Sequence, residues 1–201
     1  MPHHPGIPTD RTFPMRERLH TRSIEFNGYR RDDGLWDIEA ELRDLRHYDT
    51  LTPGKGLLPA GQPVHHMAIT LTLNNEFVVQ DVSAKMLSTP FGMCLEIQDS
   101  LKPLVGARIG YGWRKAISER IGGVQSCTHL RELLVNMATA ALQTIPIWHV
   151  QQRKKQGLPP SDERPHYLGQ CHSWRLDGPV VLQHHPRFHQ PPTTPPQQET
   201  P

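Results

Sequence analysis

The sequence of 201 residues lacks the features that identify several large protein classes. No apolar run approaches the roughly 20 residues of a membrane-spanning helix. The first residues, Met1-Pro2-His3-His4-Pro5, do not resemble a secretory signal. The 22 basic and 20 acidic residues give a formal net charge of +2, which does not indicate a surface for nucleic acid. We therefore expect a cytoplasmic protein whose partner is a protein or a small molecule, not nucleic acid or a membrane.

Cysteine is scarce, since the chain has only three. Three cysteines without a signal do not form the disulfide framework of a small secreted domain, so we expect reduced thiols. The spacings CxxC and HExxH do not occur. Ser126 lacks the context of a nucleophile elbow, and Gly110-Tyr111-Gly112 lacks the full dinucleotide fingerprint. The sequence therefore names no enzyme class by motif.

Composition divides the chain into a middle and two polar ends. Residues 1–18 are rich in proline and charge, and residues 189–201 are rich in proline, glutamine and threonine. Such segments bury too little apolar area to order themselves, so we predict a disordered arm and a disordered tail. The middle, residues 19–188, is predicted to form a single domain.

The first half of this domain has the alternation of β-strands. Apolar and charged residues alternate over residues 35–45, which predicts a half-buried antiparallel strand with Trp36, Ile38, Ala40 and Leu42 inward. Asn27-Gly28 predicts a turn after a first strand over residues 21–26. Further strands are predicted over residues 64–73 and 77–86, with Met67, Ile69, Leu71 and Leu73 inward.

The second half changes to a helical period. Helices are predicted over residues 93–105, in a segment that ends at about residue 121, and over residues 127–143. Pro146 should kink or split the last of these helices. A short closing segment, interpreted as an edge strand, is predicted within residues 170–182. The fold class is therefore α+β, an antiparallel sheet of three to five strands with about three helices on one face.

The start of the third helix is the clearest chemical feature. Gly122-Gly123 allows a sharp turn, and Cys127 and His129 then stand at the first turn of an amphipathic helix. A helix N-terminus favours anions, so it should lower the pKa of the Cys127 thiol.

Three hypotheses follow from the cysteines and histidines. In the first, a metal-binding accessory protein holds zinc, iron or an iron–sulfur cluster through Cys94, Cys127, Cys171 and His129. His66, His172 and Asp33 are the secondary candidates. In the second, a small enzyme of catabolic metabolism uses Cys127 as nucleophile and His129, His66 or Asp33 as base. In the third, the cysteines are core residues of a non-catalytic interaction module.

Several short motifs also resemble one bacterial family. They are Thr21-Arg22-Ser23-Ile24, Tyr29 through Ala40, His66-Met67, Thr89-Pro90-Phe91 with Cys94, Gly112-Trp113, Gly122-Gly123, Cys127-Thr128-His129-Leu130 and Cys171-His172. Together they resemble the domain-of-unknown-function family DUF2889 from about residue 20 to residue 188. His65-His66-Met67 stands where this family usually has His-Asp-Met. The family has no established activity, so the resemblance implies no reaction.

A second resemblance concerns the order of cysteines and elements. Asp81-Val82-Ser83-Ala84 ends a hairpin, a turn with Cys94 follows, and Cys127 opens the later helix. This order is similar to iron–sulfur scaffold proteins of the NifU and SufU type, and it implies that Cys94 and Cys127 converge on a metal. The middle cysteine of those proteins has no counterpart in residues 107–126.

Overall fold

The computed structural model describes residues 15–191. Most of the predicted arm (residues 1–18) and tail (residues 189–201) lies outside this range, so their disorder stays a prediction. The chain divides into two compact units, Met1–Trp148 and His149–Pro201.

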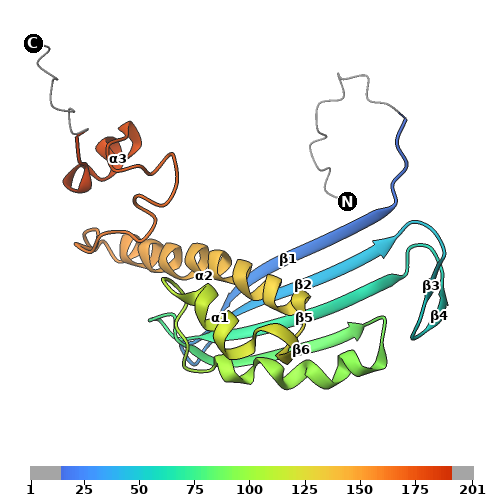
Figure 1. Cartoon of the computed structure of the whole chain (residues 1–201). Coiled ribbons are helices and arrows are strands. Elements are labelled where there is room, and N and C mark those ends of the chain that lie inside the picture. Colours follow the sequence, from blue (N-terminus) through green and yellow to red (C-terminus); the bar gives the residue numbers. More distant parts are fainter. Residues whose placement is uncertain (1–14, 192–201) are drawn as a thin grey trace, which may run out of the picture. The chain divides into compact units, whose positions relative to one another are not determined.

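The first unit is built on a four-stranded antiparallel sheet with the strand order β1-β2-β5-β6 (Figure 1). The strands are β1 (His20–Arg30), β2 (Trp36–Arg46), β5 (Pro63–Leu73) and β6 (Val79–Ser88). Between β2 and β5, the short strands β3 (Thr50–Thr52) and β4 (Gly56–Leu58) form a separate hairpin. Helices then follow the sheet in sequence, which confirms the α+β prediction.

The helical half begins with a 3-10 helix, η1 (Gly92–Leu104), and continues with α1 (Trp113–Ile121), a 3-10 turn η2 (Gly123–Gln125) and α2 (Thr128–Lys155). Helices α1 and α2 lie on one face of the sheet (Figure 1). The core forms between them from the inward strand residues and the apolar stripe of α2, which comprises Leu130, Leu133, Leu134, Met137, Ala141 and Ile145. Helix α2 is long and apolar enough to cross a membrane, but the core helices of soluble proteins often meet the same criteria of length and composition.

The sequence predicted that Pro146 would kink or split the helix. It does not split α2, because the helix continues to Lys155. Proline removes a backbone hydrogen bond from a helix interior, so neighbouring contacts have to hold the two sides together. Ile145 is buried in the core just before it, and the Trp148 ring packs edge-on against Trp36 at 5.3 Å just after it. Packing against the sheet on both sides of the proline therefore compensates for the lost bond.

The predicted turn at Asn27-Gly28 is wrong, because both residues lie inside β1 and pair with Glu39 and Ile38 of β2. A local turn signal is overridden here by tertiary packing. Gly28 lies against Thr144 of α2 so closely that a Cβ atom on Gly28 would be 2.2 Å from the Thr144 hydroxyl oxygen. Glycine is required at this position by the approach of the helix, not by a turn.

The predicted closing strand within residues 170–182 does not form. In the described part of the second unit, this region has turns, followed by α3 (Pro179–His184) and the 3-10 turn η3 (Pro186–Phe188). Proline is favoured at the first position of a helix and lacks the N–H that a strand interior uses. Pro179 therefore starts a helix where the apolar run alone had indicated a strand.

We expect Gly28→Ala to lower the free energy of unfolding by about 1–3 kcal/mol, the usual cost of overpacking. The new methyl group would have to displace the Thr144 side chain, which is itself bonded to the Ala140 carbonyl oxygen. Gly92→Ala is the matched control, since no atom lies within 4 Å of its added Cβ. Thermal melting of both variants is the measurement. Equal melting temperatures would mean that Thr144 moves aside without cost.

Candidate functional site

At one end of the helix-covered sheet face, polar side chains replace apolar ones. Arg22 of β1, Asp44 of β2 and His65 of β5 lie directly opposite one another in the strand register. The neighbouring row in the same register is apolar and consists of Ile24, Leu42 and Met67. The pairing of β2 with β5 shifts just after Asp44, which places a β-bulge beside this polar row.

The carboxylate of Asp44 is the centre of the row, and its side chain is only 5% exposed. Arg22 donates two hydrogen bonds to it, from Nε to Oδ1 at 2.7 Å and from Nη2 to Oδ2 at 2.9 Å. Nδ1 of His65 lies 3.2 Å from Oδ2, and Nε2 of His129 lies 3.7 Å from the same oxygen. Nε2 of His20 lies 3.3 Å from Oδ1.

Asp44 stays ionised in spite of its burial. Burial by itself would raise the pKa of the Asp44 carboxyl, because it removes water from the charged form. The hydrogen bonds and the charge of Arg22, with smaller contributions from His65 and His129, outweigh burial and lower this pKa.

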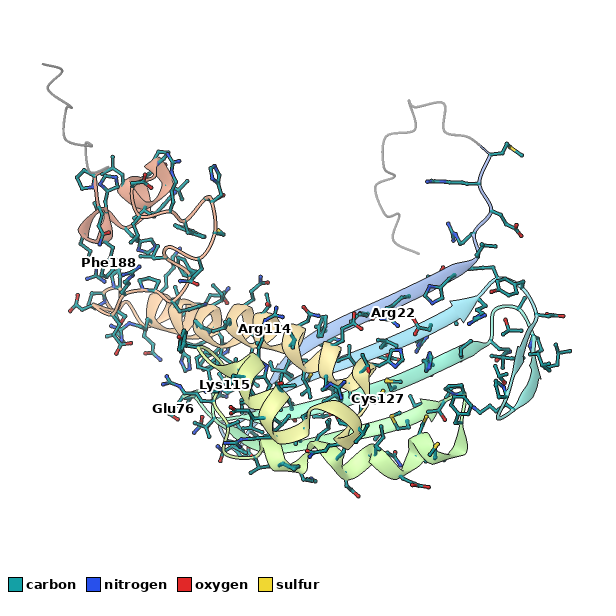
Figure 2. The ribbon with its side chains drawn as sticks, in the orientation of Figure 1. Arg22, Glu76, Arg114, Lys115, Cys127 and Phe188 are labelled. Atoms are coloured by element: carbon teal, nitrogen blue, oxygen red, sulfur yellow. The ribbon has the colours of Figure 1, made fainter. Side chains whose placement is uncertain are left out.

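Helix α2 brings two more groups to the row at its first turn. Cys127 directly precedes the helix, and its Sγ lies 3.4 Å from Nδ1 of His129. The ring of His129 lies over the ring of His65 with 4.2 Å between centroids. Nη1 of Arg22 donates to Glu132 at 2.8 Å and so ties the edge strand to the helix. Figure 2 shows Arg22 and Cys127 at the same end of the sheet.

The thiol and the imidazole shift each other's titration. Burial would raise the pKa of Cys127, but the hydrogen bond with His129 and the backbone N–H groups of Leu130 and His129 outweigh it, so this pKa is lowered. The same contact with Cys127 raises the pKa of His129 against its own burial. Burial is the largest influence on the pKa of His65 and the neighbouring His129 is the second, and both lower this pKa. His65 is therefore neutral at neutral pH.

The structure brings together only part of the predicted site. Within residues 15–191, the group of histidine, cysteine or acidic side chains close enough to share a metal ion is Asp44, His65 and His129. Neither Cys94 nor Cys127 belongs to this group. Cys94 packs against the hydrophobic core, and Cys171 is exposed in the second unit, as part of the same turn region as His172. Of the four predicted ligands, only His129 belongs to this group.

The secondary candidates lie elsewhere. His66 points away from His65, on the other face of β5, and its Nε2 lies 2.5 Å from Oε1 of Glu41. Asp33 is in the exposed turn after β1, where it accepts hydrogen bonds from Arg31 and from the backbone N–H of Leu35.

Sequence reasoning missed Arg22, Asp44 and His65, although strand alternation could have found Asp44 and His65. Asp44 stands two residues after Leu42, and His65 stands two residues before Met67, so both continue an inward face that the alternation predicts. Choosing His66 in place of His65 selected the wrong face. A polar residue at an inward position is the signal that identifies the site.

Comparison with known proteins gives one match. The model of a family described as a protein of unknown function (DUF2889) matches residues 20–143, which is more than half of the chain and contains the whole polar row and the start of α2. Neither the curated proteins nor the solved structures contain a match to this chain. The similarity to iron–sulfur scaffold proteins is therefore unsupported.

We expect Arg22→Ala to lower the free energy of unfolding at neutral pH by about 3 kcal/mol. This is the lower end of the cost of leaving a buried charge unpaired, because the Arg22 side chain is itself 33% exposed. Without Arg22 the pKa of Asp44 rises, so the deficit should shrink as the pH falls and the carboxyl takes up a proton. Denaturant unfolding between neutral and acidic pH measures both effects.

Arg31→Ala is the control, since its ion pair with Asp33 lies in an exposed turn, where solvent screens such pairs and they contribute little to stability. If the loss of unfolding free energy in Arg22→Ala stays constant with pH, that loss does not come from the unpaired charge of Asp44.

Proposed function

The chain belongs to the DUF2889 family, and we propose that it binds a divalent transition-metal ion through Asp44, His65 and His129. One observation carries the proposal. A carboxylate oxygen from β2 and two imidazole nitrogens from β5 and α2 lie within 4.8 Å of one another.

The distances and the donor types fit such an ion. Zinc binds histidine nitrogen at about 2.0–2.1 Å and carboxylate oxygen at about 2.0–2.2 Å, so its ligand atoms lie roughly 3–4 Å apart. The separations of 3.2 Å and 3.7 Å from Oδ2 of Asp44 to the two nitrogens are of this size. Imidazole with a single carboxylate suits zinc or ferrous iron better than calcium or magnesium. Three protein ligands also leave coordination positions open.

The surrounding charges support a cation at this place. Arg22 keeps Asp44 ionised, and ionised carboxylate is the form that ligates. The positive charge of Arg22 opposes the ion, but Glu132 pairs with the same guanidinium and offsets part of this repulsion. The lowered pKa of His65 keeps its imidazole neutral, which is the form that ligates.

Thiol chemistry at Cys127 is the second candidate, favoured by its contact with His129. In this arrangement the two nitrogens of His129 face the sulfur of Cys127 and the carboxylate of Asp44. Cys127 would be the nucleophile, His129 the base and Asp44 the group that orients the base. However, two cavities in the part of the chain that the structure describes, one of about 550 Å³ between β1 and α2 and one of about 330 Å³ over β2, β5 and β6, are lined by neither Cys127 nor His129. A metal ion requires no cavity of that size, so we favour metal binding.

We expect protein purified without oxygen, or metal-free protein titrated with zinc or ferrous iron, to bind about one equivalent. His65→Ala and His129→Ala each remove a ligand. Their affinity should fall by more than the roughly 10- to 100-fold that loss of a supporting partner costs. Elemental analysis and titration calorimetry are the measurements.

His66→Ala is the matched control, because it removes the neighbouring imidazole on the opposite face of the same strand. It should bind like the unchanged protein. An unchanged protein that stays metal-free and ignores both added ions would end the proposal, as would equal loss of binding in His66→Ala.

A further inference from the structure

We propose that Cys127 is a positioning residue for His129 and not a metal ligand. Its sulfur accepts a hydrogen bond from Nδ1 of His129 and thereby turns Nε2 toward Oδ2 of Asp44. This inference rests on the proposed metal site, and it replaces the cysteine ligation expected from the sequence with a different role for the same residue.

The two nitrogens of His129 have different partners. Nδ1 lies 3.4 Å from Sγ of Cys127, whereas Nε2 lies 3.7 Å from Oδ2 of Asp44. A neutral imidazole carries one N–H, so a proton on Nδ1 leaves a bare lone pair on Nε2. That lone pair faces a carboxylate oxygen at a distance too long for a normal hydrogen bond. A positive charge between the two atoms, either a metal ion or a proton on Nε2, removes the repulsion.

The sulfur is held in place by the start of the helix. Cys127 is half-buried and immediately precedes α2, and backbone N–H groups of His129 and Leu130 interact with it. Only one residue separates it from His129, so both side chains are fixed by the same turn. A rigid acceptor on the non-coordinating nitrogen is the usual way in which proteins orient a metal-bound histidine.

The position of the sulfur also argues against direct ligation. Cys127 does not belong to the group of ligand atoms within 4.8 Å of one another, whereas Asp44, His65 and His129 do. Sγ lies on the Nδ1 side of the His129 ring, and the metal position lies on the Nε2 side. A thiolate ligand to zinc would require a bond of about 2.3 Å.

Cobalt(II) is the probe for ligation, because a thiolate ligand gives it a strong charge-transfer band in the near ultraviolet. We expect the cobalt-loaded protein to show weak visible bands without that band. Cys127→Ala should then weaken zinc binding by about 10- to 100-fold, the cost of removing a residue that orients a metal ligand. Cys127→Ser keeps a hydrogen-bond acceptor on a shorter bond. Its zinc affinity should therefore lie between those of the unchanged protein and Cys127→Ala.

Cys94→Ala is the matched control, since Cys94 is also partly buried against the core but does not belong to the metal group. It should bind zinc like the unchanged protein. A strong thiolate band would overturn the inference in favour of ligation. Unchanged zinc affinity in Cys127→Ala would overturn it in favour of a structural role.

A second measurement works without metal. Long-range ¹⁵N–¹H correlation at alkaline pH, where the ring is neutral, should show His129 with its proton on Nδ1. In Cys127→Ala, but not in Cys94→Ala, the proton should move to Nε2, where Asp44 can accept it. An Nε2–H tautomer in the unchanged protein would refute the inference. If the protein binds no metal but the tautomer of His129 still depends on Cys127, the proposed function is wrong and the hydrogen bond between Cys127 and His129 is confirmed.

Discussion

The burial of one carboxylate is the constraint on which the rest of the site depends. Asp44 occupies an inward position of β2, where every preceding inward residue from Trp36 to Leu42 is apolar. A buried charge without partners is very costly, so the surroundings have to supply compensating charge and hydrogen bonds. Arg22, His65 and His129 do so from three different elements. The position of Asp44 therefore couples the edge strand, the sheet centre and the start of α2.

The sheet register is what makes this compensation possible. Directly opposed residues of neighbouring strands lie close together on one face, so one polar residue on each of three strands forms a continuous row. The row stands at the end of the apolar core, where the side chains of His65 and His129 stay about one-fifth exposed. An ion can reach these imidazoles from solvent while the carboxylate stays buried.

Strand alternation predicted the inward faces of β2 and β5, and the helical period predicted the buried stripe of α2. The same alternation, continued by one step in each strand, leads to Asp44 and His65. Local signals failed where a distant residue decides the conformation. Gly28 lies in a strand because Thr144 approaches it, and α2 continues through Pro146 because Ile145 and Trp148 pack on the sheet. The sequence could not decide whether the cysteines converge on one site, because spacing along the chain does not fix distances between elements.

A charge count relates the thiol to the valence of the proposed ion. Asp44 and Glu132 share the single guanidinium of Arg22, which leaves one negative charge between them. Cys127 adds a second negative charge when its thiol is ionised, and the contact with His129 lowers the pKa of this thiol. With both imidazoles neutral, the cluster then carries two negative charges, which a divalent cation neutralises and a monovalent cation does not. Without the cation a proton on His129 offsets part of this charge, and the raised pKa of His129 is consistent with such an exchange.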